Sequence, residues 1–341
     1  MIITRTPFRI SFFGGGTDYP AWYREHGGAV LSTSINKYCY ITVRHLAPIF
    51  PYKYRIRYTH QEEAMSLAEI QHTSVRECMK FLNFFDTSIE MQHNADLPAM
   101  IGLGSSSSFT VGFLHALYTM GGKKVSKQQL AEEAIHVEQE YCREHVGSQD
   151  QTIAASGGLN KIEFSKDGSI HVAPLSIIRE KANRLADHCM LIYTGQSRVA
   201  SEIAAEQIKN TPAKNNELDL MRQMVDEAMS ILASKQDRFQ DFGTLLHESW
   251  QIKRTLSSKI TNPLIDAMYE EALKVGAYGG KLLGAGGGGF LLLFVPPELQ
   301  RRVREHFEKS IFIPFAFEQE GTQVVYQAAD ESGNIPPATI V

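Results

Sequence analysis

The 341-residue sequence has only four cysteines, and they stand apart from one another, at Cys39, Cys78, Cys142 and Cys189. Because no C-x-x-C pair is present, neither a zinc site nor a disulfide framework is predicted, and the thiols fit a reducing compartment. No apolar run reaches the ~18 residues needed to cross a bilayer, and the N-terminus has no signal-peptide segment. The net charge is −4 and there is no basic block, so nucleic acid is not an expected partner. We expect a cytoplasmic protein that binds neither membrane nor nucleic acid.

The composition is that of a folded protein, with 43% hydrophobic and 21% charged residues, which excludes a disordered chain. The length exceeds what one compact core usually covers, so two domains are expected. The chain changes character near residues 182–187. We therefore predict one domain over residues 1–184 and a second over residues 185–330, followed by a frayed tail.

Apolar patterning predicts α+β structure in this chain. The β-branched and aromatic segments of the first part favour strands over residues 10–13, 29–31, 38–43, 54–58 and 88–93. A helix is expected over residues 72–85, and the second half is mostly helical. One apolar stripe recurs there at helical spacing, through Leu218, Met221, Val225, Ala228 and Leu232. Asn262 before Pro263 predicts a helix start, and residues 290–295 predict a buried strand.

A glycine- and serine-rich stretch at residues 98–108 is the most informative feature of the sequence. Phe109, Phe113 and Leu117 then recur every four residues, which predicts a helix that begins at the serines. A helix N-terminus carries unpaired N–H groups that suit phosphate, and glycine lets the backbone approach an anion closely. The stretch therefore predicts a phosphate-binding loop whose serine hydroxyl can also bind Mg²⁺. An ordinary loop with serine N-caps is the alternative.

Two further glycine-rich turns lie far away in the sequence, at residues 14–16 and 284–289. Each adjoins an apolar run, whereas flexible linkers lack flanking core segments. There is no Walker motif, and the second turn matches G-x-G-x-x-G only formally. A dinucleotide-binding turn opens a helix, but here the strand-like residues 290–295 follow. The three turns thus predict nucleotide binding of another type.

In order and spacing these three motifs resemble those of the GHMP kinases, over roughly residues 5–295. The run Gly14-Gly-Gly-Thr-Asp18 is similar to the branch that acts on heptose phosphates, the D-glycero-D-manno-heptose 7-phosphate kinases. The resemblance implies a sugar kinase that uses ATP and Mg²⁺, with its active site between two domains. It also implies a two-domain fold, with an N-terminal ribosomal S5 domain 2-like α/β domain and a C-terminal ferredoxin-like α+β domain.

One acidic residue is a candidate metal ligand. Ser126 and Gln129 form a capping box for a helix expected to run to about Glu144, and Glu138 interrupts its apolar stripe. A buried carboxylate needs a partner, so Glu138 lies either at the wet edge of the stripe or beside a cation. The resemblance makes Glu138 a magnesium ligand together with Ser106, with the register among the serines open by one. It places the ATP phosphates on Gly102, Gly104, Ser105, Ser106, Ser107 and Ser108.

The resemblance also assigns the reacting groups. Taken alone, Asp150 is a turn aspartate and Arg9 a surface charge. By resemblance Asp150 is the base that accepts the proton of the acceptor hydroxyl. Arg9 holds it ionised and stabilises charge on the γ-phosphate. The substrate-binding residues implied are Asp18, Gly15, Gly16, Thr17, Arg198 and Gly287.

The acceptor expected from the resemblance is D-glycero-D-manno-heptose 7-phosphate, phosphorylated at its anomeric O1. The product would be the 1,7-bisphosphate, in nucleotide-activated heptose biosynthesis for surface polysaccharide. A second phosphate on the acceptor needs a further cation, for which Arg198 is the leading candidate. Lys37 and Lys281 are weaker candidates, because each is expected to be a surface charge.

Two other functions stay open at this point. One is an anomeric kinase of a free sugar such as fucose or galactose, although Gly15 and Gly16 stand where galactokinases carry Glu and His. The other is a non-catalytic regulator that binds sugar and ATP. Four motif residues favour the enzyme, namely Arg9, Asp18, Glu138 and Asp150. The oligomeric state stays open, with a homodimer as one alternative.

Overall fold

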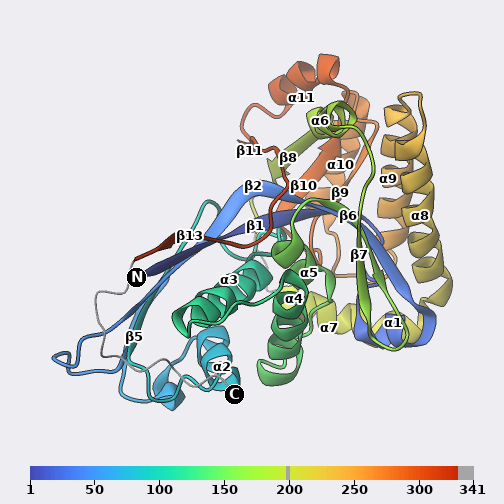
Figure 1. The fold of residues 1–341 in the computed structure, drawn as a ribbon. Helices are drawn as coiled ribbons and strands as arrows, with labels where there is room; N and C mark the ends of the chain where they lie inside the picture. The colour runs from blue at the N-terminus through green and yellow to red at the C-terminus, as the bar shows by residue number, and fades with distance from the viewer. Residues whose placement is uncertain (197–199, 329–341) are drawn as a thin grey trace.

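The protein is seen in a computed structural model that describes residues 1–196 and 200–328. Within these ranges two β-sheets are surrounded by helices, which confirms the α+β class. In Figure 1, β1 (Ile2–Phe13) and β2 (Gly28–His45) run through the middle of the molecule. Below them lie α2 (Thr73–Phe81) and α3 (Ser105–Met120), and above them lies the second sheet.

The larger sheet has nine strands and is built on the antiparallel pair of β1 and β2. The first residues of β1 alternate between buried and partly exposed, whereas all residues from Thr6 onward are buried. The change follows from packing, because α3 lies against β1 and Phe242 of α9 (Phe239–Lys253) touches Phe12 and Phe13 at its end. The remaining strands are β3 (Tyr54–Arg57), β4 (Gln61–Ala64), β5 (Ile89–Ala95), β6 (Leu159–Phe164), β7 (Ile170–Pro174), β12 (Phe317–Glu318) and β13 (Gln323–Gln327).

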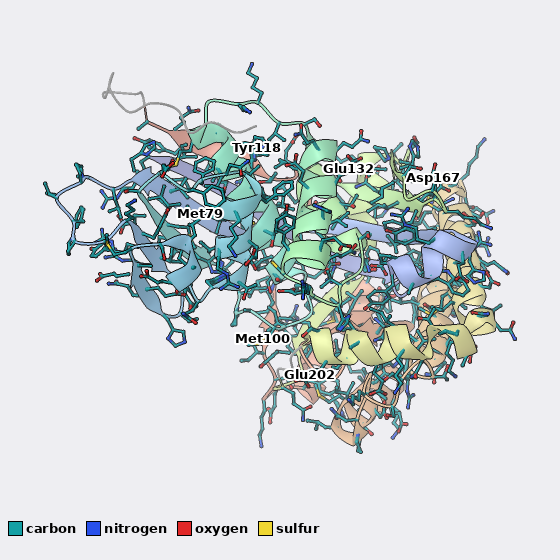
Figure 2. The ribbon with its side chains drawn as sticks, turned by 90° about the horizontal axis from the view of Figure 1, so that it is seen from below. Met79, Met100, Tyr118, Glu132, Asp167 and Glu202 are labelled. Atoms are coloured by element: carbon teal, nitrogen blue, oxygen red, sulfur yellow. The ribbon has the colours of Figure 1, made fainter. Side chains whose placement is uncertain are left out.

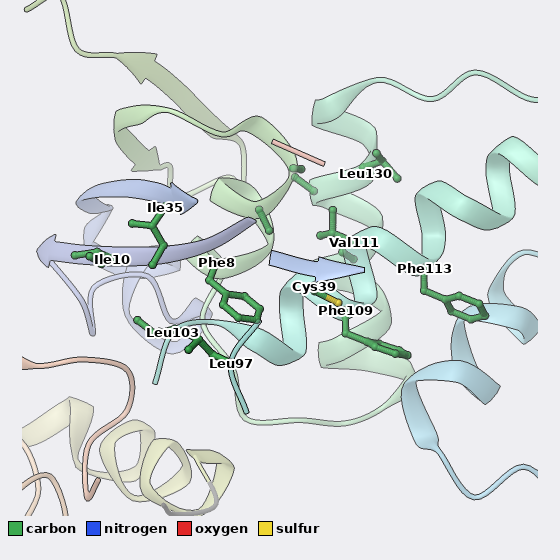
Figure 3. Packing of buried hydrophobic residues seen from close by; sticks show 14 of the residues in the cluster. Phe8, Ile10, Ile35, Cys39, Leu97, Leu103, Phe109, Val111, Phe113 and Leu130 are labelled. Atoms are coloured by element: carbon green, nitrogen blue, oxygen red, sulfur yellow. The ribbon is translucent and has the colours of Figure 1, made fainter. Parts of the chain in front are cut away.

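Helix α3 forms the centre of the first half of the chain. It is buried on nearly every side, as expected for a helix that is apolar all round, and packs against both long strands. Figure 3 shows its Phe109, Val111 and Phe113 in the buried cluster that also contains Phe8 of β1. α3 packs against α2, α4 (Lys127–His136) and α5 (Gln149–Ser156). The first half also contains α1 (Pro20–His26), a 3₁₀ turn η1 (Leu67–Glu69) and a π-helical turn η2 (Val137–Tyr141).

The second sheet is antiparallel, in the order β11-β8-β10-β9. Every residue of β10 (Phe290–Phe294) is buried, which confirms the predicted core strand. Its partners are β8 (Cys189–Tyr193), β9 (Gly279–Leu282) and β11 (Phe312–Ile313). The helices of this half are α6 (Arg179–Asp187), α7 (Ala200–Asn210), α8 (Asn215–Ala233), α10 (Pro263–Lys274) and α11 (Gln300–His306), with 3₁₀ turns η3 (Thr211–Ala213) and η4 (Pro297–Leu299). Among the described residues, no helix is both long and apolar enough to span a membrane.

Two predicted helix starts are confirmed by their caps. The Ser126 side chain accepts a hydrogen bond from the N–H of Gln129, and Asn262 accepts from two N–H groups in the first turn of α10. The helix after Ser126 ends earlier than predicted, because it changes to the π-helical turn η2. The short helix α5 was not predicted, since it carries little apolar periodicity.

The chain returns to the first sheet at its end. Strands β12 and β13 pair with β2 and β1, so residues 317–327 complete the larger sheet. The predicted boundary at 184/185 falls inside α6. This division of the chain stays a prediction, and the returning strands tie its two parts together.

Candidate active site

The second and third glycine-rich motifs touch each other, and β1, the strand that leads into the first, lies beside them. The N–H of Arg9 donates to the carbonyl of Leu103 at 3.1 Å, which joins the end of β1 to the loop before α3. On its other side the loop touches the third motif. A Cβ at Gly102 would lie 2.5 Å from the carbonyl oxygen of Leu283, and one at Gly284 would lie 2.7 Å from the Cα of Gly102. Both glycines have positive φ, so no larger residue fits this contact.

Arg9 and Asp150 form a bidentate ion pair beside this loop. The Arg9 Nε and Nη2 atoms each donate to one carboxylate oxygen of Asp150 at 2.7 Å, and Nη1 donates to the carbonyl of Gly102 at 2.7 Å. The Asp150 side chain is 24% exposed, whereas that of Arg9 is 5% exposed. The guanidinium therefore fixes the carboxylate in orientation and leaves it accessible to a substrate. Asp150 lies in the first helical turn of α5 and not in a turn between two elements.

Gly104 brings the helix start next to this pair. It is the N-cap of α3, with φ 74°, and a Cβ there would lie 3.2 Å from Cγ of Arg9 and 3.3 Å from Oδ2 of Asp150. No side chain caps the helix, so the alternative of serine N-caps is wrong. The first N–H groups of α3 thus point to a space beside an arginine and a carboxylate, which suits the phosphates of a nucleotide.

The four serines of the loop have different surroundings. Ser106 is exposed and Ser105 partly exposed at the start of α3. The Ser107 hydroxyl donates to Oε2 of Glu138 at 2.9 Å, and the Ser108 hydroxyl donates to the carbonyl of Pro7 at 2.9 Å. Ser107 rather than Ser106 therefore lies against Glu138, and Ser108 fastens α3 to β1.

Glu138 is a completely buried carboxylate on the π-helical turn η2. By contrast Glu132, labelled on α4 in Figure 2, is exposed. Oε2 of Glu138 accepts from Ser107 and Gln151, whereas Oε1 has no hydrogen bond of normal geometry. Burial, and then the charge of Glu144, raise the pKa of Glu138 to about 7. The Thr110 hydroxyl also lies near the carboxylate and partly opposes the rise of its pKa. An orphaned carboxylate oxygen next to a serine hydroxyl fits a cation, since Mg²⁺ usually takes only one or two protein ligands besides phosphate. No cluster of three or more His, Cys, Asp or Glu side chains suited to a metal occurs in the described ranges.

The first glycine turn places a second carboxylate near Asp150. Asp18 is buried and accepts from the N–H of Gly16 at 2.9 Å. Burial raises the pKa of Asp18, the Gly16 bond opposes the rise, and the charge of Asp150 adds to it. Thr17 is fully buried, and its hydroxyl donates to the carbonyls of Gly14 and Ala29, so it holds the turn together.

The other predicted substrate residues do not all lie beside the Arg9–Asp150 pair. Gly15 lies near the hydroxyl of Ser11, and Gly16 lies beside Leu218 of α8. Gly287 borders a hollow of about 310 Å³, lined also by Glu202, Ile203, Ser258, Lys259, Thr261 and Asn262. Arg198 lies outside the described residues.

Sequence reasoning missed two cations near this site. Lys253, at the end of α9, is buried and was not considered, although it continues the buried face of Leu246 and Trp250 at helical spacing. Lys281, on β9, was expected at the surface but is only 1% exposed, so that expectation was wrong. Gln151, which donates to Glu138, was also not recognised.

The chain is similar to known proteins over most of its length. The GHMP kinases N terminal domain matches residues 72–158, and the GHMP kinases C terminal domain matches residues 230–311. The D-glycero-alpha-D-manno-heptose 7-phosphate kinase of Campylobacter jejuni is 30% identical over 94% of this chain and 98% of its own length. An L-fucokinase/L-fucose-1-P guanylyltransferase of Bacteroides fragilis is 26% identical over 94% of this chain, but over only 38% of its own length. The crystal structure of a D-glycero-D-manno-heptose 1-phosphate kinase from Bacteroides thetaiotaomicron has the same fold. It has a TM-score of 0.77 and 22% identity, and the match covers 96% of this chain and all of that one.

The Arg9–Asp150 ion pair thus lies beside the N-terminus of α3, an arrangement suited to phosphoryl transfer. The chain belongs to the GHMP kinases and is an enzyme of the sugar-kinase type, a class that uses ATP as phosphate donor.

Proposed function

We propose that the protein transfers the γ-phosphoryl group of ATP to the anomeric O1 of D-glycero-D-manno-heptose 7-phosphate. The observation that carries this proposal is the Arg9–Asp150 pair, held 2.7 Å apart beside Gly104 at the start of α3. The similarity to the D-glycero-alpha-D-manno-heptose 7-phosphate kinase of Campylobacter jejuni, at 30% identity, supports a heptose phosphate as acceptor. The product is the 1,7-bisphosphate, and the proposed setting is nucleotide-activated heptose biosynthesis in the cytoplasm.

The roles of the residues follow from their positions. The carboxylate of Asp150 accepts the proton of the O1 hydroxyl as that oxygen bonds to the γ-phosphorus, and the bond to the β,γ-bridging oxygen breaks with its electron pair leaving on ADP. Arg9 orients Asp150 and stabilises charge on the transferred group. The ATP phosphates lie on Gly102, Gly104 and the first serines of α3. Asp18, Gly15, Gly16, Thr17, Gly287 and Arg198 are the proposed acceptor residues.

Glu138 is the proposed anchor for Mg²⁺. Its free Oε1 would hold the ion, and the hydroxyl of Ser106 or Ser107 would complete the protein's share of the ligands. When bound, the ion neutralises charge on the nucleotide phosphates. Ser107 is in contact with Glu138, whereas Ser106 is the serine that the family motif favours.

A second candidate is a kinase that phosphorylates a free sugar. It is supported by the match to the fucokinase of Bacteroides fragilis over nearly the whole chain. The two candidates differ in whether the acceptor carries a phosphate before the reaction.

The test compares kcat/KM for heptose 7-phosphate with that for free heptose, fucose, galactose and mannose, by the release of ADP. A phosphate held by charge-assisted hydrogen bonds raises kcat/KM by about one to two powers of ten. Equal or better turnover of a free sugar would refute the heptose phosphate assignment in favour of the second candidate. No turnover with any sugar would favour a non-catalytic regulator.

A further inference from the structure

Two buried lysines from the second half of the chain lie behind the catalytic pair. Lys253 Nζ donates to the carbonyl of Gly284 at 2.7 Å, and Lys281 Nζ donates to the carbonyl of Phe12 at 3.0 Å. The two residues are 5% and 1% exposed. Lys253 therefore fastens α9 to the third glycine motif. Lys281 fastens β9 to the end of β1, just before the first glycine turn.

Neither ammonium group has a carboxylate partner. No ion pair within residues 1–196 and 200–328 includes Lys253 or Lys281. Buried charges are normally paired, because leaving water costs a charged group several kcal/mol or more. Each ammonium group has three N–H donors, and the one peptide carbonyl that accepts from it carries no counter-charge. An unpaired buried ammonium therefore needs a reason.

The charged groups around Lys253 come from every element that meets here. Asp18 follows β1, Asp150 lies on α5, and Arg9 and Lys281 lie on β1 and β9. Burial is the main cause that lowers the pKa of Lys253, to about 8, with a further contribution from Arg9. The carboxylates of Asp18 and Asp150 oppose this change. Burial also lowers the pKa of Lys281 well below its usual value and raises that of Asp18, so it favours the neutral form of both. The positive charges of Lys253 and Arg9 then exceed the single negative charge of Asp150.

The contact chain leads directly to the reacting groups. Lys253 binds the carbonyl of Gly284, Gly284 lies against Gly102, and the Gly102 carbonyl accepts from Arg9, which holds Asp150. An anionic group bound beside Asp150 would offset the excess positive charge. Neutral acceptors would leave it uncompensated.

We propose that Lys253, supported by Lys281, is an electrostatic specificity determinant of the acceptor site, and that it selects an acceptor carrying a negatively charged group. This inference rests on the proposed function and extends it. Lys253 would provide a positive charge near the bound phosphate of the acceptor. Lys253 acts through the field of its ammonium group and through Gly284, so it is a positioning residue and takes no proton from the substrate.

The experiment measures the ratio of kcat/KM for heptose 7-phosphate to that for free heptose, with the full-length protein and saturating ATP at pH 7. The Lys253→Met variant should lower this ratio by about tenfold or more, because the charge is lost. The Lys253→Arg variant keeps the charge and should therefore retain most of the wild-type ratio. The matched control is Lys274→Met on α10, whose side chain is 68% exposed, and it should leave the ratio unchanged.

A second arm needs no variant. In the wild-type protein the ratio should fall as the pH rises from 7 to 9.5, since Lys253 then loses its proton. A ratio that is the same in Lys253→Met and wild type, or that does not change with pH, would overturn the role of Lys253 and leave the proposed acceptor standing. A wild-type enzyme without preference for the phosphorylated sugar would overturn both.

Discussion

Replacing Glu138 by glutamine separates the stability of the fold from its function. The pKa of this carboxyl rises from 4.5 to about 7 in the folded protein, chiefly because of burial. A raised pKa means that the carboxyl stabilises the fold in its protonated form. That contribution is complete below pH 4.5 and is lost as the pH rises through about 7. The difference between the two pKa values lowers the free energy of unfolding of the metal-free protein by about 3 kcal/mol at high pH.

Glutamine has the same shape and no charge to bury. Metal-free Glu138→Gln is therefore expected to be more stable than wild type by about 2 kcal/mol at pH 8, and by less than about 1 kcal/mol at pH 5. Urea unfolding in the presence of a chelator at the two pH values measures this difference. The exposed Glu132 on α4 provides the control, since Glu132→Gln should change stability at neither pH.

The same variant should lose function. Without the carboxylate, the Mg²⁺ concentration for half-maximal activity should rise about tenfold or more. Mg²⁺ with ATP should also stabilise the variant less than wild type in thermal unfolding. A variant that is less stable at pH 8 and has an unchanged Mg²⁺ titration would refute the reasoning, because Glu138 would then be a structural residue.

Three further predictions concern the catalytic pair and its surroundings. Asp150→Asn should lower kcat by about 10² to 10⁴ while ATP binding, measured by calorimetry, survives; turnover within a few-fold of wild type would exclude Asp150 as the base. Gly104→Ala forces a side chain into positive φ, 3.2 Å from Arg9, and should cost about 1 kcal/mol of stability and at least about tenfold in kcat. For Lys253 the folded-state pKa is depressed to about 8, so its stabilising contribution exists above pH 10.5 and is lost as the pH falls through 8. Unfolding experiments should accordingly show Lys253→Met gaining stability over wild type at pH 7 and losing that gain by pH 10; an advantage independent of pH would contradict the assignment.

Much of the site could be predicted from motifs, because each motif has its own local signal. Glycine is the residue that most readily adopts positive φ, and Gly102, Gly104 and Gly284 all do so in the structure. The apolar periodicity after residue 108 also gave the correct helix. What joins the motifs is tertiary, and no local pattern reveals that the third motif packs on the second.

Other parts of the site could not be predicted. The π-helical turn that carries Glu138 has no sequence signature, and it places Ser107 rather than Ser106 against the carboxylate. Lys253 resembles any lysine at a helix end until its buried neighbours are known. Its burial follows from the packing of α9 against β9 and β1.

The most direct test of the central claim is the structure of the product. The wild-type enzyme is incubated with ATP, Mg²⁺ and D-glycero-D-manno-heptose 7-phosphate, and the sugar is examined by phosphorus NMR with coupling to its protons. We expect one new phosphorus signal from the sugar, coupled to the anomeric proton and formed in equal amount with ADP. In the same incubation time, Asp150→Asn should give no such signal. A phosphate on any other hydroxyl, or ADP formed without a phosphorylated sugar, would contradict it.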